Sequence, residues 1–285
     1  MNKIKIKSFA KINLFLNVGK KINKTNLHDI QSLVCLVNLS DEIKIQKSKN
    51  KKDKISFFGK FSHYVYKNNT ITKSISILRN KGLIPQNIHY NVKVNKRIPV
   101  FSGLGGGSSN AAYLIKNLIK KEKLTKQNKS IFSKYIGSDL KLFFETNQFF
   151  QKKLDQIVKL KTRLNLYFII VYPFLKSSTK EIYSKVKSVR KIKKNSIYEN
   201  GTKKKVIKNL IKEQNSLEKI VVSKFPIIKN VLIELKKLNK CLFSRVTGSG
   251  SACFGVFLTK KSADLGLKKI RKKFPKFWCV VGKTI

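Results

Sequence analysis

Hydrophobic and polar residues alternate with a period of two along several short stretches of this chain, which predicts β-strands. The alternation is clearest over residues 3–9, 41–48 and 91–98, and a further strand is expected over 13–18. In the first stretch we expect Ile4 and Ile6 to face the core. Short apolar runs predict more deeply buried strands at 166–172, 242–246, 252–258 and 277–283.

Other stretches repeat their apolar residues at the spacing of a helix. A helix is predicted to start at Ser108, a second to begin at Pro226, and a third to cover 262–274. Residues 185–208 are rich in lysine with few large apolar side chains, and are expected to contain a loose surface loop. The mixture of elements predicts an α+β protein. We expect two domains, residues 1–155 and 156–285.

The 285 residues carry a formal net charge of +49. Only six of the 63 basic residues are arginine, whereas proteins that read nucleic acid favour the planar guanidinium. We therefore expect no specific nucleic acid partner, although weak non-specific adhesion to RNA stays open. No apolar run approaches the roughly 20 residues of a membrane span, and the four cysteines are too far apart for a metal or disulfide framework. A cytoplasmic protein without a membrane partner is expected.

A glycine-rich stretch, GLGGGSSNAA at 103–112, lies between a predicted strand and a predicted helix. Glycine lets backbone N–H groups approach an anion, and a helix N-terminus adds partial positive charge. The stretch therefore predicts a phosphate site, in which Ser108 and Ser109 could also contact Mg²⁺. The alternative is a flexible turn in which one of these serines caps the helix.

Three ordered motifs of the chain resemble those of the GHMP kinases: SFAKINLFLNV at 8–18, RIPVFSGLGGGSSNAA at 97–112 and RVTGSGSACFGVF at 245–257. The resemblance implies an ATP-dependent small-molecule kinase that uses Mg²⁺ and acts as a monomer or homodimer. It also implies an N-terminal domain like ribosomal protein S5 and a C-terminal ferredoxin-like sandwich.

Within the family, NLHDIQSL at 26–33 and GSDLKLFF at 137–144 are most similar to members that phosphorylate a cytidine diphosphate ester of methylerythritol. This similarity implies transfer to a 2-hydroxyl in isoprenoid precursor synthesis. The chain departs from the pattern at three places. Leu27 replaces a tyrosine that stacks on cytosine, while Ser8 and Lys141 each replace a proline.

The resemblance also implies a role for individual residues. Asp139 would accept or orient the proton of the acceptor hydroxyl, with Lys11 beside it lowering the pKa of the carboxyl. ATP contacts are implied for Asn69, Pro99, Ser102, Gly103, Leu104, Gly105, Gly106, Gly107, Ser108 and Ser109. Substrate contacts are implied for Asn13, His28, Thr179, Tyr183, Thr247, Gly248, Ser249 and Gly250.

Taken without the motifs, these residues have plainer interpretations: Asp139 as a helix-capping carboxylate, Lys11 as a solvated lysine, Asn69 as part of a turn, and 247–250 as a hairpin turn. Three other functions stay open. A sister kinase acting on mevalonate, homoserine or a sugar should lack the cytosine-site residues His28 and Tyr183. A basic RNA-binding protein should show clustered arginine, and a decaying enzyme would keep the motifs with weakened activity.

Overall fold

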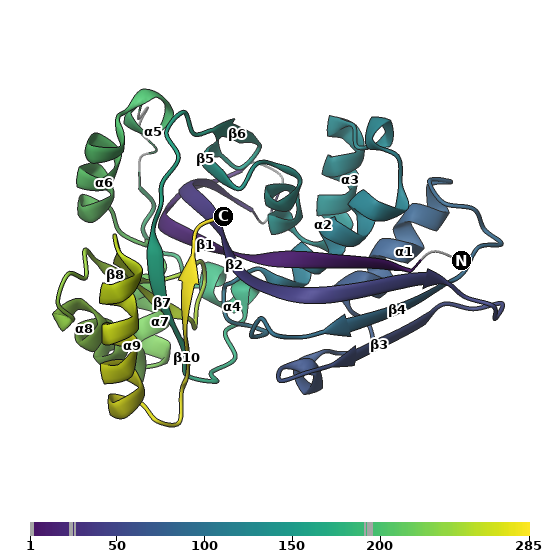
Figure 1. The fold of residues 1–285 in the computed structure, drawn as a ribbon. Coiled ribbons are helices and arrows are strands. Elements are labelled where there is room, and N and C mark those ends of the chain that lie inside the picture. The colour runs from purple at the N-terminus through teal and green to yellow at the C-terminus, as the bar shows by residue number, and fades with distance from the viewer. Residues whose placement is uncertain (1–2, 23–24, 26, 191, 193–195) are drawn as a thin grey trace. The chain divides into compact units, whose positions relative to one another are not determined.

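The computed structural model describes residues 3–22, 25, 27–190, 192 and 196–285 (Figure 1). The chain forms two compact units, each assembled from several segments. Unit 1 contains residues 1–10, 39–100 and 105–145, and unit 2 contains residues 11–38, 101–104 and 146–285. The strands β1 (Ile4–Lys21) and β2 (His28–Lys47) pair with each other and contribute residues to both units.

Unit 1 combines a small sheet with three helices. Strand β4 (Tyr90–Asn95) pairs antiparallel with the end of β2 and parallel with β3 (Lys54–Phe58). The helices α1 (Thr70–Asn80), α2 (Gly106–Leu118) and α3 (Lys126–Ile136) gather on one side of these strands (Figure 1). Three 3₁₀ turns complete the unit: η1 (Ser62–Tyr64), η2 (Lys121–Lys123) and η3 (Ser138–Phe144).

Unit 2 contains an antiparallel sheet in the order β10-β7-β9-β8. Its strands are β7 (Tyr167–Tyr172), β8 (Ser244–Val246), β9 (Cys253–Phe257) and β10 (Trp278–Lys283). The start of β2 also pairs with β5 (Gln148–Lys153), which pairs with β6 (Gln156–Lys159). The helices of the unit are α4 (Thr179–Ser184), α5 (Ile197–Asn200), α6 (Lys203–Lys212), α7 (Glu218–Lys224), α8 (Ile227–Lys237) and α9 (Lys260–Lys273).

Helices α8 and α9 pack on the four-stranded sheet through their apolar faces. In α8 the buried positions are Ile228, Val231 and Leu235, which recur at the period of a helix and form one stripe. In α9, Gly266 allows a close approach, because a Cβ there would lie 2.8 Å from a methyl carbon of Ile169. The predicted α+β class is thus confirmed.

Several local expectations need correction. Residues 3–9 and 13–18 belong to one continuous strand, β1. Ile6 is buried as predicted, but Ile4 is 38% exposed. The lysine-rich stretch 185–208 has no helix or strand over 186–190, but it also includes α5 and the start of α6; residues 191 and 193–195 lie outside the described part of the chain. Helix α6 was not predicted because it buries only Val206 and Leu210, too few for a visible apolar stripe. No helix among the described residues has both the length and the apolar character needed to cross a bilayer.

Candidate active site

Helix α2 of unit 1 begins at Gly106, with Gly105 as its N-cap in a left-handed conformation (φ +71°). As a glycine, this N-cap residue has no side chain that could cap the N-terminus. Ser108 and Ser109 lie inside the first turn, so the interpretation of either serine as the N-cap is wrong. The Ser109 hydroxyl instead donates to the Phe9 carbonyl at 2.7 Å. The first N–H groups of α2 are therefore placed as an anion site requires.

A buried polar cluster in unit 1 supports the start of α2. The Lys96 ammonium donates to the Asp41 carboxylate and to the Asn110 amide oxygen, the latter at 3.0 Å. Asp41 also accepts from the backbone N–H groups of Arg97 and Ile98 at 2.7 and 2.8 Å. Gly106 fits tightly here, because a Cβ would lie 2.9 Å from the Ile98 side chain and 3.3 Å from Lys96 Nζ. The predicted ATP residue Pro99 is buried directly after this segment. Sequence reasoning did not single out Lys96 or Asp41.

Asp139 lies in η3 of unit 1 and is half-buried. Gly137, two residues earlier, has a φ of +150°, and a Cβ built on it would lie 4.0 Å from Ser108 Oγ. Within unit 1, the structure therefore places the GSD motif next to the first turn of α2. This arrangement agrees with a role of both segments in one site.

Asn69 is the N-cap of α1. Its side-chain oxygen accepts from the N–H groups of Ile71 and Thr72, and its amide donates to the carbonyls of Tyr66 and Lys67. The turn interpretation of Asn69 thus describes its present contacts, and its predicted contact with ATP stays a prediction. The neighbouring Thr70 hydroxyl donates to the Gly107 carbonyl at 2.8 Å, which joins the start of α1 to the glycine-rich stretch.

Lys11 of unit 2 is buried, with 3% of its surface exposed, so the interpretation of a solvated lysine is wrong. Its ammonium donates to the side-chain oxygen of Asn13. The Asn13 amide donates to Ser32 Oγ at 2.9 Å, and Ser32 Oγ donates to the Phe15 carbonyl at 2.6 Å. This chain of hydrogen bonds fixes the Lys11–Asn13 pair. Ser32 is a part of the site that the sequence did not single out, although it lies within a quoted motif.

The loop 247–250 of unit 2 lies against the same pair. Thr247 Oγ1 accepts from the backbone N–H of Asn13 at 3.1 Å. Gly248 has a φ of +55°, and a Cβ built on it would lie 3.1 Å from Lys11 Nζ and 3.4 Å from Asn13 Oδ1. Four predicted site residues, Lys11, Asn13, Thr247 and Gly248, are therefore brought together within unit 2.

Residues 101–104, which also belong to unit 2, contact the same loop. Gly103 has a φ of +82°, and a Cβ there would lie only 2.2 Å from the Thr247 carbonyl oxygen and 3.0 Å from the Gly250 nitrogen. Ser102 is buried and its carbonyl accepts from the N–H of Ala252 at 2.9 Å, while the Leu104 carbonyl accepts from the N–H of Lys11 at 3.0 Å. Only glycine fits at position 103, because both its backbone conformation and its surroundings exclude a side chain.

Thr179 and Ser249 share a side-chain hydrogen bond of 3.0 Å. His28 and Tyr183 form a second pair in unit 2, with ring centroids 5.8 Å apart. His28 is 5% exposed, and its Nδ1 is buried without a hydrogen-bond partner among the described residues. Burial, and to a lesser degree the charge of Lys21, lowers the pKa of this imidazole below 6.5. His28 is therefore neutral at physiological pH.

Arg245 lies in β8, two residues before the loop 247–250, and is 4% exposed. Its guanidinium donates to the carbonyls of Leu14 and Leu210, both at 2.7 Å, and to that of Glu213. It also lies 3.9 Å from the centre of the Phe243 ring. Burial lowers the pKa of Arg245 to about 10, against the opposite effect of the nearby carboxylates.

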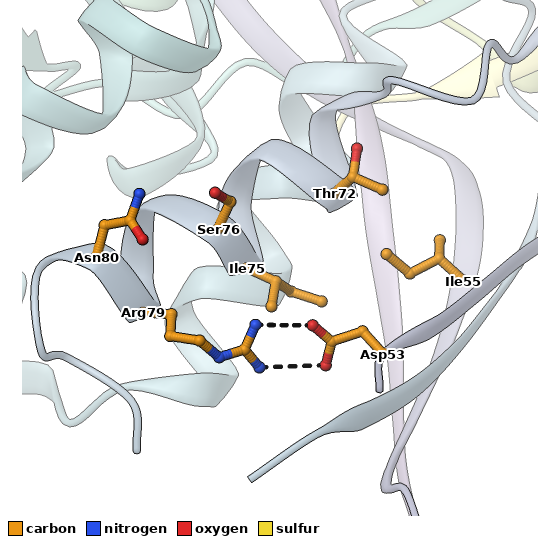
Figure 2. Close-up of a pocket in the computed structure, with 7 residues that line it drawn as sticks. All are labelled: Asp53, Ile55, Thr72, Ile75, Ser76, Arg79 and Asn80. Carbon is orange, nitrogen blue, oxygen red and sulfur yellow. Dashed lines mark hydrogen bonds and ion pairs between the residues drawn. The ribbon is translucent and has the colours of Figure 1, made fainter. Parts of the chain in front are cut away.

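A separate cavity of about 250 Å³ opens in unit 1 between α1 and β3 (Figure 2). Figure 2 shows Arg79 extending from α1 toward Asp53, with two nearly parallel hydrogen bonds of 2.8 and 3.2 Å. The cavity is lined by Asp53, Ile55, Thr72, Ile75, Ser76, Arg79 and Asn80. None of the predicted site residues lines this cavity.

Comparison with known proteins agrees with this arrangement. Residues 69–138 match the family model for the GHMP kinases N-terminal domain, and residues 200–276 match the model described as GHMP kinases C terminal. A protein of Pelagibacter ubique named 4-diphosphocytidyl-2-C-methyl-D-erythritol kinase is 39% identical over 100% of both chains. A protein of the same name from Buchnera aphidicola is 36% identical, over 90% of this chain and 85% of the relative.

The fold is shared with solved structures of related kinases. A crystal structure of 4-(cytidine 5'-diphospho)-2C-methyl-D-erythritol kinase superimposes with a TM-score of 0.72 at 20% identity, covering 99% of this chain and 100% of the other. A homoserine kinase from Cytophaga hutchinsonii gives a TM-score of 0.70 at 16% identity, covering 100% of this chain and 95% of the other. With two matched family models and relatives similar over the full length, this chain belongs to the GHMP kinase family.

Proposed function

We propose that this chain transfers the γ-phosphoryl group of ATP to the 2-hydroxyl of 4-diphosphocytidyl-2-C-methyl-D-erythritol, in the methylerythritol phosphate route to isoprenoid precursors. The observation that carries this choice of substrate is the pairing of His28 with Tyr183. An aromatic ring can stack on a nucleobase, and the buried Nδ1 of His28 can hydrogen-bond to its edge. Mevalonate and homoserine contain no base, so these kinase substrates would leave the pair without a role.

ATP would bind with its phosphates at the N-terminus of α2, where the N-cap residue is a glycine without a capping side chain. The proposed ATP contacts are Ser102 to Ser109, together with Pro99 and Asn69. Mg²⁺ would enter with ATP and be held mainly by phosphate oxygens, aided by the Ser108 and Ser109 hydroxyls. When bound, it neutralises charge on the phosphates.

In the proposed reaction, Asp139 accepts or orients the proton of the attacking hydroxyl. Lys11 supplies fixed positive charge, and its burial beside Asn13 restricts the ammonium to one position. Asn13 is proposed to contact the methylerythritol portion, and His28 and Tyr183 the cytosine. Thr179 and the loop 247–250 are proposed as further substrate contacts.

Three further proposals concern the whole protein. Residues 1–155 and 156–285 are proposed as its two family domains, since the two matched models fall on either side of this boundary. We propose a cytoplasmic location, as expected for an enzyme with soluble substrates. A monomer or a homodimer is proposed as the active form, without specific nucleic acid.

The test is ADP release from Mg·ATP with 4-diphosphocytidyl-2-C-methyl-D-erythritol, mevalonate and homoserine offered in parallel. We expect turnover with the cytidine ester alone, and its loss in Asp139→Ala. Asp155→Ala, which removes an exposed carboxylate, should behave as wild type. Preference for mevalonate or homoserine would overturn the substrate, and a fully active Asp139→Ala would overturn the role of Asp139.

A further inference from the structure

The segment Asn215–Glu218 of unit 2 was not singled out from the sequence, yet it contacts the loop 247–250 with buried polar groups. Asn215 is 5% exposed. Its side-chain amide donates to the carbonyl of Val246 and to the carbonyl of Gly248, both at 2.8 Å. One amide group thus satisfies two carbonyls on either side of Thr247.

Glu218 binds the other backbone group of Val246, its N–H. One carboxylate oxygen of Glu218 accepts from the N–H of Val246 at 2.8 Å. Burial raises the pKa of Glu218, while this hydrogen bond and the charge of Arg245 oppose the rise. Val246 is therefore held at its N–H by Glu218 and at its carbonyl by Asn215.

Asn215 is itself held from three directions, so its amide is preorganised. Its side-chain oxygen accepts from the N–H of Leu217 at 2.9 Å. On either side of it, the Gln214 carbonyl accepts from the N–H of Leu16 at 3.1 Å, and the Ser216 N–H donates to the Leu16 carbonyl at 2.7 Å. The segment is thereby fastened to β1, the strand that carries Lys11 and Asn13.

The backbone that Asn215 and Glu218 hold lies beside Lys11 and Asn13. Thr247 is bonded to the backbone of Asn13, and Gly248 packs against Lys11 Nζ and Asn13 Oδ1. Glycine at 248 has a φ of +55° and no side chain, so it can be held only through its backbone groups, and Asn215 binds its carbonyl. A displacement of Gly248 would remove the packing on one side of the Lys11 ammonium.

We propose that Asn215 and Glu218 are positioning residues, which hold the loop 247–250 against Lys11 and Asn13 and so determine the rate of phosphoryl transfer. The inference rests on the proposed kinase function. Neither residue is expected to touch the substrate. Their effect should therefore fall on kcat and, through the substrate contacts of the loop 247–250, on the KM for the cytidine ester, whereas the KM for ATP should change little.

The principal variant is Asn215→Ala, compared with Asn209→Ala as a matched control. Asn209 lies on α6 and donates to the Tyr198 hydroxyl at 2.7 Å, away from the loop. We expect kcat of Asn215→Ala to fall at least about tenfold, because a misplacement of order 1 Å can cost far more than this. The KM for ATP should change less than about threefold. Asn209→Ala should keep wild-type kinetics. Wild-type kinetics in Asn215→Ala would overturn the proposal.

Asn215→Asp separates positioning from general loss of packing. It has the same shape, but its carboxylate would face two carbonyls at 2.8 Å, and only the protonated acid can donate to one of them. We expect kcat of Asn215→Asp, divided by that of Asn215→Ala, to rise as the pH is lowered from about 8 to about 6, since burial among carbonyls raises the pKa of such an acid. This ratio cancels pH effects that are common to both variants; the charged groups near this segment are Glu213, Glu218, Arg245 and Lys11. A ratio independent of pH would count against the proposal.

Glu218→Gln keeps an oxygen for the N–H of Val246, whereas Glu218→Ala removes it. The glutamine variant should therefore recover most of the activity that the alanine variant loses.

Hydrogen exchange supplies a readout independent of catalysis. In Asn215→Ala, amides of 246–252 should exchange faster while those of α8 stay unchanged. Uniformly faster exchange would show general destabilisation and overturn the proposal, and an inactive wild type with a protected loop would instead sink the proposed function.

Discussion

The imidazole ring of His28 lies 5.8 Å from the phenol ring of Tyr183, centroid to centroid, with the two planes tilted by 38°. His28 is the first residue of β2, and Tyr183 lies in α4. Neither position indicates its partner, since the two are far apart in the sequence. Their pairing gives unit 2 an aromatic site with one unpaired buried nitrogen among the described residues.

Next to this pair, Leu27 is 45% exposed, at the position where the motif resemblance leads us to expect a stacking tyrosine. We expect Leu27→Tyr to lower the KM for the cytidine ester by about fivefold or more, because an aromatic ring stacked on a base contributes roughly 1–3 kcal/mol. The KM for ATP should not change. Leu258→Tyr is the control, since Leu258 is 47% exposed just beyond the end of β9. An equal gain in both variants would contradict stacking at position 27.

The neutral state of His28 predicts a pH dependence of substrate binding. Burial, and to a lesser degree the charge of Lys21, lowers the pKa of the His28 imidazole in the folded protein below 6.5. His28 therefore becomes charged only when the pH falls below that value. Protonation would then put a charge in a buried site, so the KM for the cytidine ester should rise as the pH falls from about 6.5 toward 5. The same proton should destabilise the fold, because the unfolded chain binds it more readily.

Measuring KM from about pH 5 to 8 for wild type and His28→Gln checks this prediction. The glutamine variant should show a higher KM for the cytidine ester that does not change with pH over that range. A rise of equal size in His28→Gln would assign the titration to another group.

Gly103 and Gly82 form a natural pair for testing the phosphate loop. Both have positive φ values, +82° and +63°, so alanine is strained at either position. A Cβ at 103 would lie 2.2 Å from the Thr247 carbonyl oxygen, whereas a Cβ at 82 meets nothing within 4 Å. Gly82→Ala should therefore lower the free energy of unfolding by only about 1 kcal/mol, with unchanged kinetics.

Gly103→Ala should lower kcat/KM for ATP by at least about a hundredfold, because the backbone must move where the phosphates are proposed to bind. Steady-state kinetics combined with urea unfolding of both variants will separate the backbone strain common to the two positions from the steric clash with the Thr247 carbonyl at position 103. Similar kinetics in the two alanine variants would exclude Gly103 from the ATP site.

The ion pair in Figure 2 predicts an acid-sensitive contribution to stability. Burial raises the pKa of Asp53, but hydrogen bonds from Arg79 and from the Tyr90 N–H, together with the Arg79 charge, outweigh it and leave the pKa below its usual value. The contribution is therefore fully present above about pH 4 and is lost as the pH falls through the lowered pKa.

Asp53→Asn should accordingly melt below wild type at pH 7, and the gap between the two should narrow on acidification toward about pH 3. Thermal melts followed by circular dichroism across this range provide the measurement. A gap that stays constant with pH would show that the carboxylate charge is not what stabilises the pair.

Much of the fold could be read from the sequence where the signal is local. The helix after the glycine-rich stretch was found because its apolar positions are close together and recur at one period. The motif residues Lys11, Asn13, Thr247 and Gly248 were found because they stand within short recognisable strings. The structure then brought these four together in unit 2.

The rest depended on contacts that a linear pattern does not contain. Asn215 and Glu218 lie in a lysine-rich region and resemble ordinary surface residues until their partners Val246 and Gly248 are known. Ile4 fits an alternating strand, yet its side chain is exposed. The period-two pattern predicts a strand but does not show where along it the packing of other elements ends. Lys96 could not be told from the other lysines without its buried partner Asp41.

The guanidinium of Arg245 also ties together parts of the chain that are synthesised at very different times. It donates to the carbonyl of Leu14, which lies 231 positions earlier in the sequence. At about 5–20 residues per second, the ribosome needs roughly 10–50 seconds to cover that distance. During this interval, the Leu14 carbonyl and the apolar residues around it must wait for their partners. Unit 2 is therefore a fold that is completed only near the end of translation.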